Sequence, residues 1–336
     1  MRNRKSTIYD LARLADVSAT TVSSVLSGNW RERRIAEDTA QRVIALAAEH
    51  RFSVNRQASG LRTSRSGLIG MIIPLHDNRF FSGMAQTFEK LARQRHLYPI
   101  VVSTLRDAAL ELETVRTLIS YRVESLIVAG ATDPDAISDV CHSHDVVHVN
   151  VDLPGRKAMS VISDNFWGAQ QLTLALIARS RPLRSATRNR PYFLGGLASD
   201  DATLRRIEGF TDAVRSKLGQ FDDGQVDACG YEPDLAEAAV AALYRRLNGL
   251  PRALFVNSTI ALEGVVRFLK TLPHAELDRC TFGCYDWDPF ASMLSFPLLM
   301  VRQNVDGLLE HAFTILDAGS AGKPGIIKIR PNLVFA

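Results

Sequence analysis

Apolar positions divide the chain into a helical beginning and a longer part in which short apolar runs alternate with amphipathic stretches. In the beginning, two apolar sets recur at three- and four-residue spacing: Leu11, Leu14 and Ala15, then Val22, Val25 and Leu26. This spacing predicts two short helices. Asp16 lies at the turn between them, Ser18 is placed to cap the second helix, and a third helix is expected over residues 38–50.

From Gly67 onward the pattern becomes an alternation of strands and helices. Strand-like apolar runs occupy residues 68–73, 99–103, 125–129, 146–151, 192–194, 253–256, 280–284 and 298–301. Helical patterns occupy residues 81–95, 109–121, 168–178, 205–218, 235–247 and 259–269. Such alternation predicts mostly parallel sheets covered on both faces. About 270 residues are too many for one such sheet, so we expect two subdomains with a cleft at the carboxyl ends of their strands.

The second predicted helix presents small and hydroxyl-bearing residues, which can approach base edges closely. These residues are Ala19, Thr20, Thr21, Ser23 and Ser24. Two short helices with such a face are typical of a helix-turn-helix that lies in the DNA major groove. An ordinary αα-hairpin is the alternative at this point. The loop over residues 28–34 is basic and holds Trp30, which favours a clamp on phosphates over a solvated turn.

Charge supports the first interpretation. Residues 1–66 carry twelve Arg and Lys against six Asp and Glu, whereas the whole chain has a net charge of only +4. A basic segment on a near-neutral body is typical of phosphate contact. Residues 51–66 are polar, with Gly60 in their middle, and are too short to be stable alone, so we expect a partner to order them.

Composition excludes several other classes of protein. With 46% hydrophobic residues the chain can bury a large core, but no apolar run reaches the roughly 18 residues of a membrane span. The polar, basic start has no apolar signal core. Cys141, Cys229, Cys280 and Cys284 lack the paired spacing of a zinc site and are expected to be reduced, buried thiols. These features predict a cytoplasmic protein without a metal or cofactor.

Several short motifs, in this order and spacing, resemble the lactose repressor/galactose repressor (LacI/GalR) family of bacterial transcription factors over nearly the whole length. The matching segments are residues 7–12, 17–23, 55–62, 68–70, 164–169, 206–210, 285–286 and 296–298, with Gln303. The extra residues 30–34 and the ending around residues 295–297 and 323–333 are most similar to the fructose and sucrose repressor branch. The resemblance implies a homodimer that binds a pseudo-palindromic operator and responds to a small ligand.

The resemblance implies a helix-turn-helix headpiece followed by an α/β, two-lobed core of the periplasmic-binding-protein type, with two parallel sheets. The expected domains are residues 1–52 for the headpiece, 53–66 for a hinge and 67–336 for the core. Within the core we expect an N-subdomain over residues 67–164 and 291–302, and a C-subdomain over residues 165–290 and 303–336. No heptad pattern follows Phe335, which favours a dimer over a tetramer assembled through a tail.

By the same resemblance, four residues face the major groove, and others contact phosphates or the hinge region of the operator. The groove residues are Ala19, Thr20, Thr21 and Ser23, next to the capping Ser18; the others are Thr7, Tyr9, Asn29, Arg31, Arg33, Arg34, Asn55 and Arg56. Leu61 is expected to wedge into the minor groove at the dyad and kink the duplex. Ser24 stands where the family often has arginine, so the operator sequence is left open.

Ligand-binding residues follow from the resemblance and from sugar chemistry. A sugar site needs planar polar side chains that can make two hydrogen bonds at once, and an aromatic ring on which the sugar can stack. The candidates are Phe80, Phe81, Asn150, Asp152, Arg206, Tyr231, Asp286 and Gln303. One of Phe80 and Phe81 is equally suited to cover the following helix. Residues 257–259 depart from the family's Asn-Asp pattern, and the basic residues 179–190 are expected to form a solvated loop. Several carboxylates favour a neutral sugar, such as sucrose or another glycoside, over a sugar phosphate.

Two other classes remain as alternatives. A sugar-transport binding protein has the same two-lobed core, but the absent signal sequence and the basic headpiece argue against it. An enzyme is also disfavoured, because the chain has no Gly-rich phosphate loop, no nucleophile–His–acid set, and only scattered histidines. The sequence leaves open the identity of the ligand, whether it releases or promotes DNA binding, and the operator itself.

Overall fold

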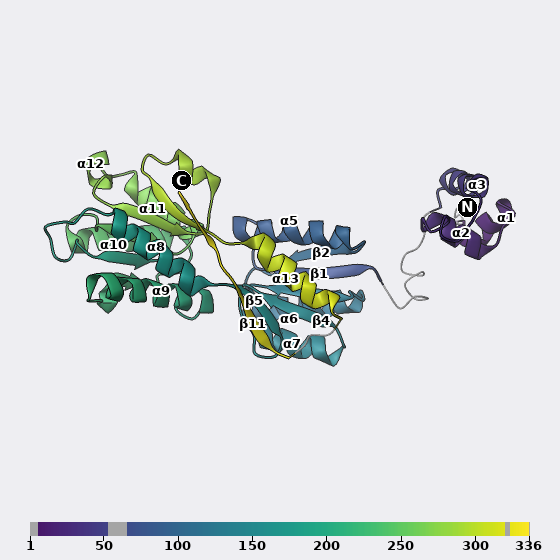
Figure 1. Cartoon of the computed structure of the whole chain (residues 1–336), viewed down its shortest axis with the longest axis horizontal. Helices are drawn as coiled ribbons and strands as arrows, with labels where there is room; N and C mark the ends of the chain where they lie inside the picture. The colour runs from purple at the N-terminus through teal and green to yellow at the C-terminus, as the bar shows by residue number, and fades with distance from the viewer. Residues whose placement is uncertain (1–5, 53–65, 320–322, 336) are drawn as a thin grey trace. The chain divides into compact units, whose positions relative to one another are not determined.

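The computed structural model describes residues 6–52, 66–319 and 323–335, and the chain divides into two units, Met1–Ser66 and Gly67–Ala336 (Figure 1). The first unit contains α1 (Ile8–Leu14), α2 (Ala19–Leu26) and α3 (Glu37–Glu49) around a small apolar cluster. The boundary at residue 67 agrees with the expected start of the core. The three expected helices are confirmed, with α3 beginning and ending one residue earlier than expected.

Capping residues explain where the headpiece helices begin. Thr7 caps α1 in a reciprocal capping box with Asp10. The Ser18 hydroxyl accepts a hydrogen bond from the Thr21 amide at 3.0 Å, which confirms the expected cap of α2. Leu14, which the apolar spacing groups with Leu11 and Ala15, is 51% exposed. The helix has only seven residues and turns Leu11 and Ala12 inward, which leaves Leu14 at the edge of the cluster.

The first lobe of the core, which we call the N-lobe, is built on a parallel sheet in the order β11-β5-β4-β3-β1-β2. Its strands are β1 (Leu68–Ile73), β2 (Tyr98–Ser103), β3 (Ser125–Ala129), β4 (Val147–Val151), β5 (Met159–Ser163) and β11 (Gly325–Ile329). Helices α5 (Arg79–Gln94) and α13 (Val305–Asp317) cover one face, and α6 (Ala108–Ser120) and α7 (Pro134–Ser143) cover the other. The inner strands β1, β3, β4 and β5 are buried on both faces, as is typical of a parallel sheet, whereas the edge strands β2 and β11 are partly exposed.

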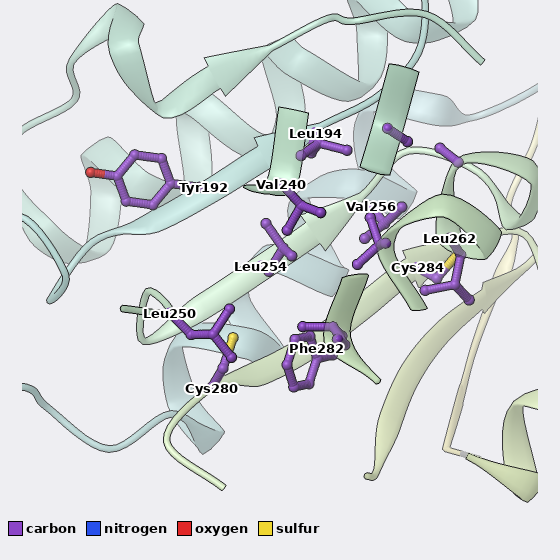
Figure 2. Packing of buried hydrophobic residues seen from close by; sticks show 14 of the residues in the cluster. Tyr192, Leu194, Val240, Leu250, Leu254, Val256, Leu262, Cys280, Phe282 and Cys284 are labelled. Carbon is purple, nitrogen blue, oxygen red and sulfur yellow. The ribbon is translucent and has the colours of Figure 1, made fainter. Parts of the chain in front are cut away.

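The second lobe, the C-lobe, repeats this plan in the strand order β12-β10-β9-β8-β6-β7. Its strands are β6 (Pro191–Leu194), β7 (Val226–Asp227), β8 (Ala253–Val256), β9 (Thr281–Tyr285), β10 (Leu298–Arg302) and β12 (Asn332–Phe335). Helices α8 (Asn165–Arg179) and α9 (Asp201–Leu218) cover one face. Helices α10 (Pro233–Leu247) and α11 (Thr259–Leu269) cover the other, where Leu254, Val256 and Phe282 pack in a large apolar cluster (Figure 2). Short helical segments are α12 (His274–Leu277), η1 (Asp223–Gln225) and η2 (Pro289–Met293).

The C-terminal part of the chain corrects the expected subdomain boundaries. We expected residues 291–302 in the N-subdomain and residues 303–336 in the C-subdomain. Instead β10 belongs to the C-lobe sheet, whereas α13 and β11 pack in the N-lobe and only β12 returns to the C-lobe. The chain therefore passes between the lobes at three places, after β5, after β10 and after β11. The strand β12 is antiparallel to β10, so the second sheet is mixed rather than purely parallel.

The basic segment before β6 is also better anchored than expected. Arg188 Nε donates to the Leu250 carbonyl oxygen at 2.8 Å, and its Nη2 lies 2.7 Å from Glu276 Oε1. The Arg252 amide donates to the Arg188 carbonyl oxygen at 2.7 Å. The expectation of a solvated loop is therefore wrong at this end, because Arg188 ties the segment to the C-lobe. Cys141, Cys280 and Cys284 are buried free thiols as expected, whereas Cys229 is half-buried.

Candidate functional site

Two aspartates occupy matching positions at the carboxyl ends of central strands in the two lobes. Asp152 follows β4 in the N-lobe and Asp286 follows β9 in the C-lobe, and both were expected to bind ligand. Both backbones are left-handed, with φ values of 74° and 76°, and each residue is 8% exposed. Left-handed non-glycine residues are strained and concentrate at functional sites. Strand ends are also where ligands bind in open α/β sheets.

Arg206 of α9 brings a buried positive charge to the same region. It is 4% exposed, and its Nε donates to Asn165 Oδ1 at 2.9 Å while Nη1 donates to the Asn257 carbonyl oxygen at 2.8 Å. The guanidinium carbon lies 3.8 Å from the centroid of the Tyr285 ring. Burial opposes the charge on Arg206, but Asp286 and the two nearby phenols outweigh it and raise its pKa. The guanidinium is therefore fixed in place and permanently charged.

Asp286 has a hydrogen-bond partner and a counter-charge. Gln303 Nε2, just after β10, donates to Asp286 Oδ1 at 2.5 Å. Burial raises the pKa of Asp286, whereas Arg206 and the bond from Gln303 act to lower it. Gln303 Oε1 is buried and has no hydrogen-bond partner in the part of the chain that the structure describes. This pair therefore offers a carboxylate acceptor and a spare amide oxygen side by side.

Asp152 has a different environment. Its pKa is raised to about 7, first by burial and then by the negative charge of Asp200, with Arg206 and Arg106 acting in the opposite direction. Asp200, which caps α9, accepts a short hydrogen bond from the Tyr231 hydroxyl. The structure thus brings Asp152, Asp286, Arg206 and Tyr231 into one electrostatically coupled group, as the sequence predicted. Asp200 was not predicted.

The aromatic candidates separate into a cavity wall and a core residue. Phe80 lines a cavity of about 480 Å³ together with Asp286, Trp287, Arg302 and Gln303. Phe81 is only 3% exposed and packs in the N-lobe core. Phe80 is therefore the residue placed to stack on a ligand. The cavity volume lies in the range of about 300–1,000 Å³ that is typical of small-molecule sites.

A single ion pair spans the lobes beside this cavity in the described part of the chain. Arg79 Nε, at the start of α5, lies 2.9 Å from Asp288 Oδ2, two residues beyond Asp286. Both side chains are partly exposed. The pair links the two walls of the cavity, although exposed ion pairs contribute little stability.

Asn150 is fully buried in β4, two residues before Asp152. It lies on the same face of β4 as His148, whose Nε2 is 2.8 Å from the Ser138 hydroxyl of α7. A Cβ on Gly155 would come within 2.7 Å of the Asn150 amide nitrogen. Asn150 therefore lies beneath the loop that follows Asp152, and both polar atoms of its amide lack a partner among the described residues.

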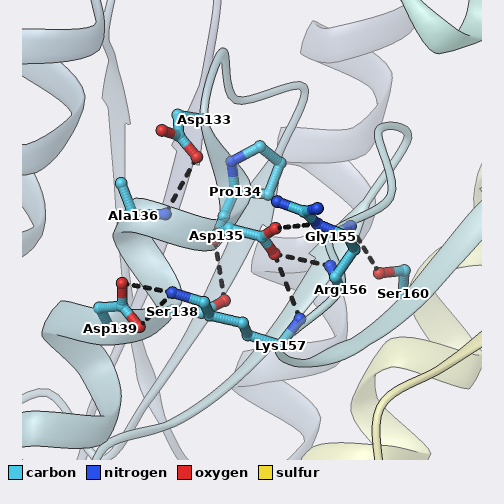
Figure 3. A network of polar contacts seen from close by, with 10 residues as sticks. All are labelled: Asp133, Pro134, Asp135, Ala136, Ser138, Asp139, Gly155, Arg156, Lys157 and Ser160. Atoms are coloured by element: carbon cyan, nitrogen blue, oxygen red, sulfur yellow. Dashed lines mark hydrogen bonds and ion pairs between the residues drawn. The ribbon is translucent and has the colours of Figure 1, made fainter.

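That loop is held by a carboxylate of α7 (Figure 3). Asp135 Oδ1 accepts from the amides of Arg156 at 2.6 Å and Lys157 at 3.2 Å, and Asp135 Oδ2 accepts from Arg156 Nε at 2.8 Å. Bonds from Arg156, first of all, keep the pKa of Asp135 low. Among the described residues, the Asp139 carboxylate bonds the Lys157 ammonium, at 2.5 Å, and no backbone amide. Asp135 is thus one anchor of the loop that follows Asp152, and the bond from the Gly155 amide to the Ser160 hydroxyl, at 3.1 Å, is another.

Two charged residues of the site were missed by sequence reasoning, Asp200 and Arg106. Both follow strands after a few residues, Asp200 after β6 and Arg106 after β2. A polar residue close to a strand end is a signal that applies to Arg106, three residues after β2, but hardly to Asp200, six residues after β6.

The headpiece presents most of the residues expected to contact DNA on its surface. Tyr9 is 74% exposed, Thr20 is exposed, and Ala19 and Ser23 are half-buried. The Thr21 hydroxyl lies 2.9 Å from the Ser18 hydroxyl, so each of these two groups already makes one hydrogen bond within the helix cap. The other surface residues are Thr7, Asn29, Arg31, Arg33 and Arg34.

The basic loop of the headpiece is built around its aromatic residue. Trp30 packs against the apolar cluster, and the Arg31 guanidinium lies 4.7 Å from its ring centroid. Arg34 has a left-handed backbone, with φ of 53°. Asn55, Arg56 and Leu61 lie outside the described residues. Across the described helices, none combines the length and hydropathy required for a membrane crossing.

Comparison with known proteins supports two regions of similarity. Residues 7–55 match the family of "Bacterial regulatory proteins, lacI family", and residues 66–272 match "Periplasmic binding proteins and sugar binding domain of LacI family". The ribitol operon repressor of Klebsiella aerogenes is 49% identical over 177 residues, which cover 53% of this chain and 66% of that protein. The sucrose operon repressor of Klebsiella pneumoniae is 29% identical over 328 residues, which cover 96% of each chain.

Solved structures share the fold. The lac repressor dimer bound to operator and the anti-inducer ONPF has a TM-score of 0.78 at 20% identity, and the alignment covers 98% of each chain. The Cra transcriptional dual regulator from Pseudomonas putida, in complex with fructose 1-phosphate, has a TM-score of 0.68 at 20% identity, covering 80% of this chain and 98% of that one. At this identity the likeness establishes the architecture: helix-turn-helix headpiece and two-lobed core.

Proposed function

Because the chain belongs to the LacI family of bacterial regulatory proteins, we propose that its cleft binds a neutral polyhydroxylated ligand, a sugar or sugar alcohol, as the effector of a DNA-binding repressor. The family places the protein among sugar-responsive, dimeric repressors that bind operator DNA. Two headpieces of such a dimer read two half-sites of a pseudo-palindromic operator. The identity of the effector is the part that must be argued from the site.

The observation that carries the proposal is the convergence of Asp152, Asp286 and Arg206 at the strand ends. Carboxylates accept hydrogen bonds from sugar hydroxyls, and a fixed guanidinium donates to them. With Asp200 and Arg106 included, the group holds three acidic and two basic residues. Because Asp152 is largely protonated below about pH 7, the other two carboxylates only balance the two guanidinium groups, so the group has no net positive charge to offset a phosphate. A neutral ligand is therefore favoured.

Ribitol is the first ligand to test, because the 49% identical relative is named a ribitol operon repressor. Sucrose is the second, from the relative that aligns over most of the chain. One alternative class of effector remains, a sugar phosphate, for which fructose 1-phosphate is a suitable probe. The proposal involves no cofactor, metal or enzymatic step, and it places the protein in the cytoplasm, on the nucleoid when bound to DNA.

On the DNA side we propose that the face around Thr20 reads base edges and that the exposed arginines position the headpiece on phosphates. Leu61 is proposed as the minor-groove wedge. Leu61→Ala should weaken operator binding sharply and leave ligand binding intact. An unchanged operator affinity in a gel-shift titration would remove the wedge from the scheme.

The experiment that tests the effector proposal combines a thermal-shift screen with operator binding in the same buffer. Ribitol, sucrose and fructose 1-phosphate are titrated against the full-length protein. A neutral ligand that binds should raise the melting temperature by mass action and change operator affinity. A response to fructose 1-phosphate alone would replace the neutral-ligand proposal with the sugar-phosphate alternative.

A further inference from the structure

Arg106 is a charged cleft residue with an unusual backbone. It follows β2, and both Leu105 and Arg106 are left-handed, with φ values of 54° and 57°. Two consecutive non-glycine residues in this region are costly, and such strain persists only where the surroundings over-determine it.

The surroundings of this turn meet that condition. The Thr104 amide donates to the Ile73 carbonyl oxygen and the Leu105 amide to that of Pro74, each at 2.9 Å. Asp107, the next residue, caps α6 by accepting from the amides of Ala109 and Leu110. The turn is therefore anchored on both sides of Arg106, at the end of β1 and at the start of α6. The strained backbone therefore fixes the direction in which the Arg106 side chain leaves the turn.

The Arg106 side chain lies between aromatic rings from the two lobes. Its guanidinium carbon is 5.2 Å from the ring centroid of Tyr231 in the C-lobe and 6.0 Å from that of Phe81 in the N-lobe. Tyr231 is itself fixed by its bonds to Asp200 and Thr203. These ring contacts orient the guanidinium without consuming its N–H donors.

The donors of Arg106 are free for a ligand. Within the described residues, its guanidinium makes no hydrogen bond and no ion pair, whereas Arg206 uses two of its nitrogens on protein atoms. Arg106 also lies close enough to Asp152 to influence that carboxyl electrostatically. An exposed guanidinium without a hydrogen-bond partner among the described residues therefore lies near a buried acid.

We propose that Arg106 is an effector-binding residue, which donates to a hydroxyl pair of the ligand whose hydroxyl protons are accepted by Asp152. A guanidinium has only donors and a carboxylate only acceptors, whereas each hydroxyl of a vicinal diol both accepts and donates. A diol between them satisfies both groups. Arg106 also stacks on Tyr231 of the C-lobe. A diol bound by Arg106 and Asp152 is therefore connected to the C-lobe through Arg106. This inference rests on the proposed function and specifies which groups of the ligand the N-lobe recognises.

The test uses the full-length protein and three variants, with ribitol, sucrose and fructose 1-phosphate as probes in isothermal titration. Arg106→Ala and Arg106→Gly both remove the donors, and glycine also relieves the left-handed strain. Arg122→Ala is the matched control, because Arg122 is an exposed N-lobe arginine with φ of 60°. We expect both Arg106 variants to lose about 10- to 100-fold in affinity for the neutral ligand, the effect of a lost hydrogen bond to a charged group.

The melting temperature separates binding from a structural role. Arg106→Gly should melt at or above Arg106→Ala and still bind poorly, whereas Arg122→Ala should bind within twofold of the original protein. Neutral-ligand affinity unchanged in both Arg106 variants overturns the inference, as does a loss confined to fructose 1-phosphate, which would make Arg106 a phosphate contact.

Asp152→Asn distinguishes a failure of the Arg106 inference from a failure of the proposed function. If Asp152→Asn weakens binding and the Arg106 variants do not, only Arg106 is wrongly assigned. If none of the three changes affinity, or no probe binds, the cleft assignment itself is wrong and the Arg106 inference is overturned with it.

Discussion

The two lobes place an aspartate at the same structural position, yet the two carboxyl groups have different surroundings. Asp286 accepts a hydrogen bond from Gln303 and lies near Arg206. Asp152 accepts no hydrogen bond from the described residues, and its pKa is raised to about 7 by burial and by Asp200. Both residues are left-handed and equally buried. Equivalent fold positions therefore need not give equivalent chemistry, because the neighbours decide the charge state.

This difference suggests a division of labour within the proposed ligand site. The C-lobe carboxylate is pre-organised, with its partners in place before a ligand arrives. The N-lobe carboxyl is held at an energetic cost that a ligand hydroxyl can relieve. A ligand that relieves it favours one arrangement of the lobes over another, which is the differential affinity that a change in operator binding requires.

The largest expected effect comes from the pre-organised side. Asp286→Asn keeps an acceptor oxygen and tolerates the left-handed backbone, since asparagine is enriched there. It removes the negative charge, and we expect the effector affinity to fall about 10- to 100-fold. Isothermal titration with ribitol or sucrose measures the loss, and circular dichroism checks the fold. Equal loss in Asp286→Asn and Asp152→Asn at every pH would erase the distinction between the two lobes.

The second prediction concerns pH and isolates Asp152. Its folded pKa of about 7 lies above the ordinary value of 3.8, so the folded state prefers the protonated form between these two values. The stability that Asp152 contributes is present below about pH 4 and is lost as the pH rises through 7. Asp152→Asn removes this titration. Between pH 5 and pH 8 the free energy of unfolding of the variant should therefore rise relative to that of the original protein, by an amount on the order of a few kcal/mol.

Parallel thermal melts over this pH range provide the measurement. A constant difference in melting temperature between the two proteins would show that Asp152 does not titrate there. Ala in place of Asn is a poor choice for this experiment, because the left-handed backbone would add a strain of its own.

A smaller effect is expected from the support of Asp152. Asp135→Ala leaves two backbone amides of the following loop without their acceptor, which should shift Asp152 and weaken effector binding several-fold. Asp139→Ala is the matched control on the same helix, because the Asp139 carboxylate bonds the exposed Lys157 side chain and no backbone amide of the described residues. Titration of both variants with the same neutral ligand measures the contrast. Similar affinities for the two would mean that the loop does not position Asp152.

The sequence predicted much of this arrangement because local patterns encode it. All eight strand-like runs became strands, and Asp152 and Asp286 were predicted from the family resemblance and from the strands that they follow. The division of the last 46 residues between the lobes was wrong, because β10, α13 and β11 are assigned by long-range packing that no local pattern reveals. The strands β5, β7, β11 and β12 were not predicted; β5, for example, holds only two apolar residues in its centre, Val161 and Ile162.

Side-chain direction was the harder problem at the site. Phe80 and Phe81 are neighbours in one helix, and only the packed structure shows which one lines the cavity. The raised pKa of Asp152 likewise depends on Asp200, which is 48 positions away in the chain and lies in the other lobe. Such charge states follow from contacts that sequence spacing does not fix.

The smallest effect is expected at Asn150, the predicted ligand residue that the structure places beneath the loop. Asn257 of the C-lobe is a comparable, fully buried asparagine, but its side-chain nitrogen lies 3.4 Å from the Thr203 hydroxyl and its backbone carbonyl oxygen accepts from Arg206. Asn150→Leu removes an amide without protein partners, so effector affinity should change less than twofold. Asn257→Leu alters the wall beside Arg206 and should cost several-fold. Circular dichroism checks that both variants are folded. If Asn150→Leu then loses as much effector affinity as Asn257→Leu, Asn150 belongs to the ligand site, and the N-lobe contributes more to binding than its geometry indicates.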